Sequence, residues 1–298
     1  MKFKIHLTPY DQFREGKLEA HENYTVGITH YFSNLFQKPQ ITITQNGRSA
    51  ISILLEHLKL KREDEVWIIT TFDYPNVSSC VTSTIFNYCK PSRVLTENTK
   101  LAFIIHEFGM VHPETADIIK RCHQRGISVV EDCAHTFLSK TTDELLAGQQ
   151  GDWTIVSFPK FYPVEMGGLL AGKNQVKENS TFSIAIENDL KCVASHLSKT
   201  NLYAQRRADI LKTILTKIQR MNLHSPLENR ECEIIPWFFP IHVIQPEYCK
   251  NRLRQFGIET CVWHGSDLLC LPLHQYISDE EVEFMLATLL SVVSEMKN

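Results

Sequence analysis

The sequence lacks the features that mark several common classes of protein. No stretch approaches the roughly 18 consecutive apolar residues of a membrane-spanning helix, and the N-terminal residues show no apolar core of signal-peptide length. Long runs of one charge, internal repeats and low-complexity segments are also missing, and the formal net charge is only −3. We therefore expect a protein with no membrane partner and no nucleic-acid partner.

The cysteines do not form the pattern of a disulfide framework. They number nine, which is odd, and no two of them are spaced as CxxC. Secreted disulfide frameworks favour even sets in much shorter chains, whereas reduced thiols are typical of the cytoplasm, where we expect this protein. The chain has 298 residues, of which 43% are hydrophobic, which is enough for one large domain and a smaller one.

What the sequence does contain is an alternation of short apolar runs with segments of helical spacing. This pattern predicts an α/β fold in which helices sandwich a mostly parallel sheet. We expect a large domain over residues 1–180 and a smaller C-terminal α+β domain over residues 181–298, whose last helix begins with a capping box of Ser278 and Glu281. The predicted strands lie at residues 41–44, 66–71, 101–105, 127–130, 153–158 and 169–171.

Ligands of such sheets bind beyond the carboxyl ends of the strands, so the residues that follow each strand matter most. After the first strand, Gly47, Arg48 and Ser49 begin a helix whose free backbone amides can bind an anion. Tyr74 follows the second strand and could stack on a flat ring, although a core aromatic is the ordinary alternative.

Two further strands are followed by groups that suit a heterocyclic aldehyde. Asp132 could pair with a protonated ring nitrogen, unless it caps a helix, and His135 could bind a phenolic oxygen. Lys160 lies three residues after Ser157, and a lysine in a cleft can lose its proton and condense with an aldehyde. Most lysines are simply solvated, but a phosphate cradle, an aromatic, a carboxylate and a lysine at successive strand ends are the set that pyridoxal 5'-phosphate needs.

These segments resemble the DegT/StrS family of pyridoxal-phosphate-dependent aminotransferases, and the chain looks like a short, divergent member. Glu131-Asp132-Cys133-Ala134-His135 is similar to the family's most specific signature, and Asn46-Gly47-Arg48-Ser49-Ala50 to its phosphate-binding turn. Thr71-Phe72-Asp73-Tyr74 resembles the aromatic segment, which would place Tyr74 over the ring. Counting back from Gly167-Gly168 puts the Schiff-base lysine of the family at Lys160, with Ser157 as the phosphate serine.

The resemblance implies a fold-type-I pyridoxal-phosphate transferase that forms a homodimer. Many members act on nucleotide-linked keto-sugars, so it implies amino transfer from glutamate to a keto-sugar nucleotide, within nucleotide-sugar biosynthesis. Lys160 and Asp132 would be the catalytic residues. The residues that would bind the cofactor are Gly47, Arg48, Ser49, Tyr74, Asp132, His135, Ser157 and Lys160.

Other assignments stay open on the sequence alone. The acceptor could be a small keto compound or aldehyde, and the chain could be a non-catalytic member of the family. Trp263 could line a pocket or lie in the interior, and Arg206-Arg207 is typical of a solvated helix face. The candidate cations for a nucleotide diphosphate are Arg206, Arg207, Arg252 and Arg254. A metal hydrolase, although no compact ligand spacing supports it, would draw on His106, Glu107, His112, Asp132 and His135.

Overall fold

The structure of the protein is a computed structural model, which describes residues 3–9, 23–72, 74–176, 183–228, 230 and 232–296. Its elements along the chain are α1 (Tyr24–Phe36), β1 (Gln40–Thr44), α2 (Gly47–His57), β2 (Glu65–Thr70), α3 (Ser79–Phe86), β3 (Lys90–Ser92), β4 (Thr99–Ile105), α4 (Thr115–His123), β5 (Ser128–Asp132), β6 (Trp153–Ser157), η2 (Phe158–Lys160), β7 (Gly168–Gly172), α5 (Ile184–His196), η3 (Leu197–Lys199), α6 (Thr200–Arg220), β8 (Phe238–His242), α7 (Pro246–Gln255), β9 (Cys261–Val262), β10 (Leu268–Pro272) and α8 (Asp279–Glu295). Among these described residues, no helix is long and apolar enough to cross a membrane.

A seven-stranded sheet in the order β1-β7-β6-β5-β4-β2-β3 forms the larger half of the molecule. The pairs β2–β3, β2–β4, β4–β5 and β5–β6 are parallel, whereas β7 is antiparallel to both of its neighbours. The α/β class with a mostly parallel sheet is therefore confirmed. All six predicted strands are present, and β3 was missed because Lys90-Pro91-Ser92 contains no apolar run.

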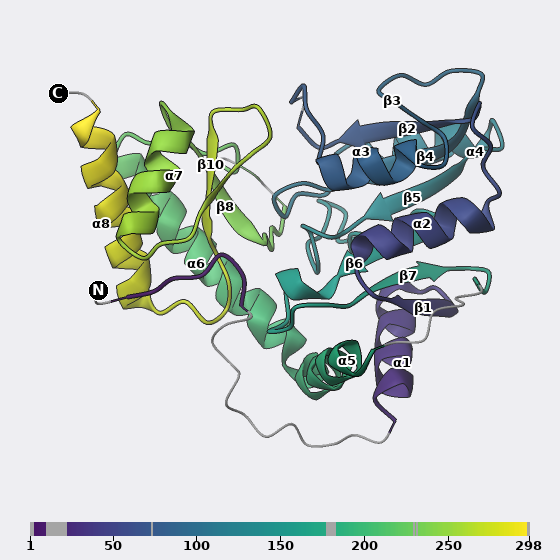
Figure 1. The fold of residues 1–298 in the computed structure, drawn as a ribbon, viewed down its shortest axis with the longest axis horizontal. Helices are drawn as coiled ribbons and strands as arrows, with labels where there is room; N and C mark the ends of the chain where they lie inside the picture. The colour runs from purple at the N-terminus through teal and green to yellow at the C-terminus, as the bar shows by residue number, and fades with distance from the viewer. Residues whose placement is uncertain are drawn as a thin grey trace.

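Helices cover both faces of this sheet (Figure 1). On one face α2 and α3 pack against the central strands through side chains such as Leu54 and Ile85. On the other face α4 packs through Ile118, and α1 and α5 pack together over β6 and β7. The strands are apolar on both sides because both sides are buried, as expected for a parallel sheet.

A second, three-stranded antiparallel sheet in the order β8-β10-β9 lies in the C-terminal half (Figure 1). Its core is shared with the helices α6, α7 and α8. The predicted capping box is present, since the Ser278 hydroxyl accepts from the Glu281 amide and the Glu281 carboxylate accepts from the Ser278 amide. The proposed domain boundary at residue 180 lies outside the described residues and stays a prediction.

Candidate active site

A cavity of about 260 Å³ lies beyond the carboxyl ends of β5 and β6. Its walls come from the starts of α2 and α3, from the ends of these two strands, and from the residue that follows β9 in the small sheet. The polar and aromatic residues in its walls are Asn46, Arg48, Ser78, Cys80, Glu107, Asp132, His135, Ser157, Lys160, Glu165 and Trp263. The cavity therefore gathers side chains from strand ends that are far apart in sequence.

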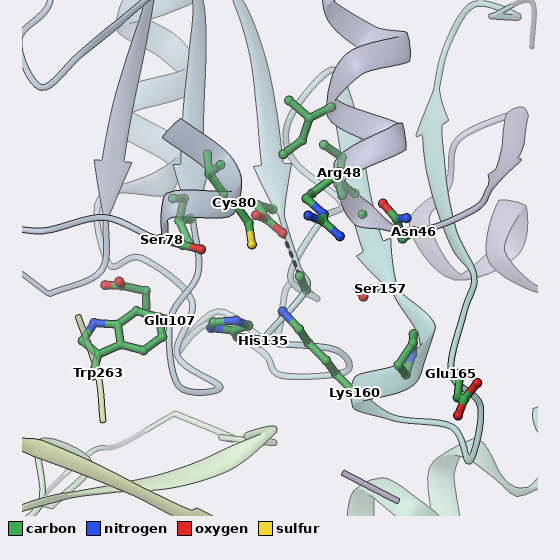
Figure 2. Close-up of a pocket in the computed structure, with 18 residues that line it drawn as sticks. Asn46, Arg48, Ser78, Cys80, Glu107, His135, Ser157, Lys160, Glu165 and Trp263 are labelled. Atoms are coloured by element: carbon green, nitrogen blue, oxygen red, sulfur yellow. Dashed lines mark hydrogen bonds between the residues drawn. The ribbon is translucent and has the colours of Figure 1, made fainter. Parts of the chain in front are cut away.

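Figure 2 shows how these side chains are distributed around the cavity. Asn46, Arg48 and Ser157 lie on one side, and Trp263 and Glu107 lie on the opposite side. The amine of Lys160 points into the space between them, toward His135. The cavity thus has an end near the start of α2, an end near the small sheet, and a lysine in its middle.

The antiparallel strand β7 brings the start of α2 next to the end of β6. Because β7 is antiparallel to both β1 and β6, these two strands point the same way, and Thr44 and Ser157 both lie opposite Gly168. A Cβ atom at Gly168 would lie 2.6 Å from the Val156 carbonyl oxygen and 3.0 Å from the backbone of Asn46. Only glycine allows this close approach, which accounts for the double glycine that located Lys160 in the sequence.

The first turn of α2 faces the end of the cavity that contains Ser157. The side chain of Asn46 caps the helix, because its Oδ1 accepts a hydrogen bond of 3.0 Å from the Ser49 amide. Gly47 and Arg48 line the cavity, but Ser49 does not. Since the first amides of a helix have no intrahelical acceptor and carry the positive end of its dipole, this turn can bind an anion. The Ser49 amide is already used by the cap.

Asp132 is a buried carboxylate at the end of β5. Its Oδ1 accepts a hydrogen bond of 2.9 Å from the Ala134 amide. Among the described residues no helix begins directly after Asp132, since the next element is β6, so the helix-cap alternative is wrong. Burial raises the pKa of this carboxyl, while the charge of Lys160 opposes the rise. A buried carboxylate with one backbone donor still has an oxygen that can accept from a ligand.

His135 lies in an aromatic cage formed by the small sheet and the segment before it. Its ring centroid is 5.1 Å from that of Trp237, 5.6 Å from Phe238 and 5.5 Å from Trp263. Burial, with smaller contributions from the charges of Lys160 and His264, holds its pKa well below the usual value, so the ring is neutral. Its Nδ1 is buried without a hydrogen-bond partner among the described residues. A buried nitrogen of this kind calls for a ligand or a water.

Lys160 ends the short 3₁₀ turn η2 that follows β6. The turn is fixed to the residue that precedes β7, because the Phe158 amide donates a hydrogen bond of 3.0 Å to the Gly167 carbonyl. Burial lowers the pKa of Lys160 to about 8, although the negative charge of Asp132 opposes this. The Nζ atom lies 4.6 Å from the centre of the Trp237 ring. A large fraction of such amines is unprotonated at mildly alkaline pH, which makes them nucleophilic.

Tyr74 is not among the residues that line the cavity. It packs with Phe72, at 6.0 Å between ring centroids, against the core of the small sheet, and burial raises its pKa to about 12. Its predicted place over a ring stays a prediction. The sequence reasoning missed Ser78 and Cys80, which lie in the wall at the start of α3. The sequence did offer a signal for these two residues. Helix α3 follows β2 as α2 follows β1, and the residues at the start of α2 had been identified from that position.

The residues proposed for a metal site do not converge. His106 is fully buried, its Nε2 bonds to Glu131 over 2.9 Å, and its Nδ1 accepts from the His112 amide. Within the described residues, no group of three or more His, Cys, Asp or Glu side chains is placed to hold a metal ion. The metal-hydrolase alternative is therefore not supported, since both nitrogens of its first candidate ligand are engaged in the interior.

The arginines of the C-terminal half also differ from expectation. Arg207 is 1% exposed, so the prediction of a solvated helix face is wrong for this residue. Arg206 pairs with Asp279 at 2.8 Å, and Arg252 pairs with Glu295 at 3.0 Å. Neither these arginines nor Arg254 line the cavity, whose described Lys and Arg residues are Arg48 and Lys160.

Two comparisons with known proteins give matches, one to a family model and one to solved structures. The family model described as "Putative PLP-dependent aminotransferase", where PLP is pyridoxal 5'-phosphate, matches residues 28–196. The structure described as "Putative sugar aminotransferase Spr1654 from Streptococcus pneumoniae, PLP-form" superposes with a TM-score of 0.77 at 18% identity, covering 98% of this chain and 99% of that one. A DegT DnrJ EryC1 StrS aminotransferase from Brucella abortus has a TM-score of 0.73 at 13% identity, covering 91% and 90%.

A third solved structure, that of DesV from S. venezuelae in complex with a ketimine intermediate, has a TM-score of 0.69 at 15% identity and covers 93% of this chain and 91% of that one. A comparison with curated protein sequences gives no match. At these identities the solved structures establish the fold, which is the one that the sequence resemblance implied.

Proposed function

The chain belongs to the family of PLP-dependent aminotransferases, whose model matches more than half of it, and from this premise we propose that it transfers an amino group from glutamate to a keto-sugar carried on a nucleotide. The observation that carries the proposal is the cavity itself. A helix N-terminus, a buried carboxylate, a neutral histidine and a lysine of lowered pKa all face one space. PLP is the cofactor of the family.

The residues in the cavity wall fit this cofactor group by group. The amides of Gly47 and Arg48, with the Ser157 hydroxyl, would bind the phosphate. The unpartnered Nδ1 of His135 would bind the phenolic oxygen, and Asp132 would bind the ring nitrogen. Lys160 would hold the aldehyde carbon. The fit rests on complementary chemistry, because each of these groups meets one functional group of the cofactor.

Bound PLP supplies an aldehyde that condenses with amines and a protonated ring that stabilises negative charge on the neighbouring carbon. Lys160 would carry the remaining acid–base work: once an amine substrate has displaced its Nζ from the aldehyde carbon, the free Nζ would take the proton from the substrate carbon that bears the amino group. It would deliver that proton to the former aldehyde carbon, on the other side of the nitrogen. Asp132 would keep the proton on the ring nitrogen. His135, being neutral, would orient the ring by a hydrogen bond without adding charge. The aromatic rings packed around His135 would keep water away from this side of the cavity.

The assignment of a sugar acceptor is supported by two observations. Two of the solved neighbours described above are named as sugar aminotransferase or as a DegT DnrJ EryC1 StrS aminotransferase. The cavity wall opposite the α2 end carries Glu107 and Trp263, and Ser78 also lines the cavity. A carboxyl, a hydroxyl and an aromatic face are groups that bind the hydroxyls and the apolar face of a sugar ring.

A small keto acceptor is the second candidate, and the arginine positions favour it. A nucleotide diphosphate needs cations or helix N-termini, yet the arginines proposed for this role do not line the cavity. Within the described residues Arg48 is the one arginine in its wall, and it lies at the proposed phosphate end. The amino form of the cofactor, prepared on the enzyme, should be challenged with keto-sugar nucleotides and with small keto acids. Recovery of the original absorbance with small acids alone would reject the sugar proposal and retain the aminotransferase.

The role of Lys160 is tested by chemical labelling. Borohydride reduction of the PLP-loaded enzyme, followed by peptide mapping, should place the cofactor on Lys160. Lys160→Ala should remain folded and lose the label, and Lys173→Ala should keep it. The rate of cofactor capture should rise as pH increases through about 8, because the amine loses its proton there. A label on another lysine would refute the assignment.

We also propose that the enzyme is a cytoplasmic homodimer. Large apolar side chains are exposed on α1, α5 and α6: Val26 at 63%, Ile184 at 79% and Leu202 at 65%. A dimer interface over these helices would remove their apolar side chains from water. All nine cysteines are free, which suits a reducing compartment. Light scattering on the purified protein measures the assembly, and a monomeric mass at micromolar concentration would reject the dimer.

A further inference from the structure

Arg207 of α6 is a buried cation whose guanidinium bonds only to neutral groups among the described residues. Its Nη2 donates to the Lys160 carbonyl over 2.8 Å, and its Nη1 donates to the Pro236 carbonyl over 3.1 Å. Its Nε donates to Oε1 of Gln275 over 2.9 Å. The acceptors come from three segments: the turn after β6, the segment before β8, and the chain after β10.

Gln275 extends this contact to the next residue of the lysine turn. Its Nε2 donates to the Phe161 carbonyl over 2.9 Å, while its Oε1 accepts from Arg207. The guanidinium carbon also lies 4.7 Å from the centre of the Phe161 ring. The consecutive carbonyls of Lys160 and Phe161 are therefore both held by side chains from the C-terminal half, which we call the Arg207–Gln275 clamp.

A buried guanidinium without an ion pair is costly, so its retention calls for a reason beyond packing. Burial lowers the pKa of Arg207 to about 9, which reflects this cost. The partners suggest the reason, because Pro236 precedes Trp237, whose ring lies 4.6 Å from the Lys160 amine. The Arg207 guanidinium thus binds the backbone of Lys160 and also the backbone of Pro236. Pro236 is next to Trp237, whose ring contacts the Lys160 amine.

We propose that Arg207 and Gln275 are positioning residues, which hold the backbone of Lys160 so that its amine stays in the desolvated cavity between Asp132 and Trp237. The proposal rests on the proposed role of Lys160. It predicts that loosening the clamp changes the environment of that amine in the folded protein, and that the C-terminal half of the chain thereby controls the reactivity of a lysine in the other half.

The test is made on the cofactor-free protein, so that it stands apart from the enzyme's activity. The fraction of Lys160 modified by labelled acetic anhydride is followed over a range of pH by mass spectrometry, in wild type and in Arg207→Met, Gln275→Leu and Arg206→Met. Arg206 is the matched control, since it is adjacent on α6 but pairs with Asp279 at the surface. Gln275→Leu removes no charge, and it replaces Arg207→Met if that variant fails to fold.

In wild type the midpoint of Lys160 modification should lie near pH 8. In Arg207→Met and Gln275→Leu it should move toward the value of about 10.4 of a solvated lysine, and PLP capture at neutral pH should slow about tenfold for every pH unit that the midpoint rises. Arg207→Lys should bring the midpoint part of the way back to that of wild type. A merely structural role would lower the unfolding midpoint and leave the titration of Lys160 unchanged, which would overturn the proposal. Borohydride fixation of PLP on a lysine other than Lys160 would instead refute the proposed function.

Discussion

Glu131 and Asp132 are neighbours on β5, both buried, and they illustrate two uses of a carboxylate. Glu131 accepts hydrogen bonds from His106, from the Gly148 amide and from the Gly151 amide. Burial alone would raise its pKa, but the hydrogen bond and charge of His106, the Gly151 amide and the charge of Lys38 hold the pKa below the usual range. Its charge is fully satisfied inside the protein.

Asp132 points to the other face of the sheet, and its donor among the described residues is the Ala134 amide at 2.9 Å. Burial therefore dominates and raises its pKa. The difference between the two residues shows that the number of internal donors, rather than burial, separates a structural carboxylate from one that is available to a ligand. Replacing Glu131 by Gln should therefore mainly lower stability, whereas replacing Asp132 by Asn should mainly lower turnover.

The largest expected effect is on turnover in Asp132→Asn. The amide oxygen can still accept from Ala134, so the fold and PLP binding should persist, but the ring nitrogen loses the group that holds its proton. We expect kcat to fall about 10²- to 10⁴-fold, measured by single-turnover kinetics. The urea midpoint serves as the control, and near-normal turnover would remove Asp132 from the catalytic residues.

Glu131→Gln should show the opposite pattern. Whichever way the amide is turned, its NH₂ group faces a backbone N–H of Gly148 or Gly151, because each carboxylate oxygen accepts from one of them. Breaking a buried charged network by removing one partner costs about 3–5 kcal/mol. Urea denaturation measures this loss, and a stable variant with low activity would contradict the division between the two faces.

Glu107 is a third buried carboxyl, and its raised pKa should make the stability of the protein depend on pH. Burial raises its pKa to about 7, against the opposing Phe72 amide and the charge of Arg93. Between an unfolded pKa of about 4.3 and this value, the folded state binds more protons than the unfolded state, so stability should fall as pH rises. Glu107→Gln stays neutral and should gain up to about 4 kcal/mol over wild type above pH 7. Parallel stability curves for the two proteins between acid and neutral pH would contradict the raised pKa.

The smallest effect should be that of Ser49→Ala. Its amide is used by the Asn46 cap and its side chain does not line the cavity, so PLP affinity should change by less than about 0.5 kcal/mol. Ser157→Ala is the matched comparison, and loss of a hydrogen bond to a charged phosphate should cost about 1.5–3 kcal/mol. Fluorescence titration with PLP measures both, and equal losses would mean that the phosphate lies differently.

Much of the fold could be read from the sequence because apolar runs and turn residues report local structure. The six strands follow from such runs, and the last helix begins where Ser278 and Glu281 predict it. The short edge strand β3 has no such run, since its residues are half-buried or exposed and β2 is its one strand partner among the described residues. The strands of the small sheet, β8, β9 and β10, were not predicted either, although β8 and β10 are buried. Local patterns therefore identified the buried strands that alternate with helices and missed a strand without an apolar run and the strands of the small antiparallel sheet.

Some residues of the candidate site could also be identified from local patterns, and others could not. Strand ends and a double glycine were enough to nominate Gly47, Arg48, Asp132, His135, Ser157 and Lys160, all of which line the cavity. Nothing in the local sequence separated Ser49 or Tyr74 from them, because whether a side chain enters a cavity depends on helix rotation and on packing against other segments.

The sequence by itself determined the alternation of strands and helices and the chemical types at the strand ends, because these are properties of residues close together in the chain. Only the tertiary structure decided that Arg207 is buried, that its guanidinium meets the Lys160 carbonyl, and that Trp237 and Trp263 surround His135. These contacts join residues 47 or more positions apart. Their free energies arise from desolvation and from converging hydrogen bonds, which no local pattern of residues encodes.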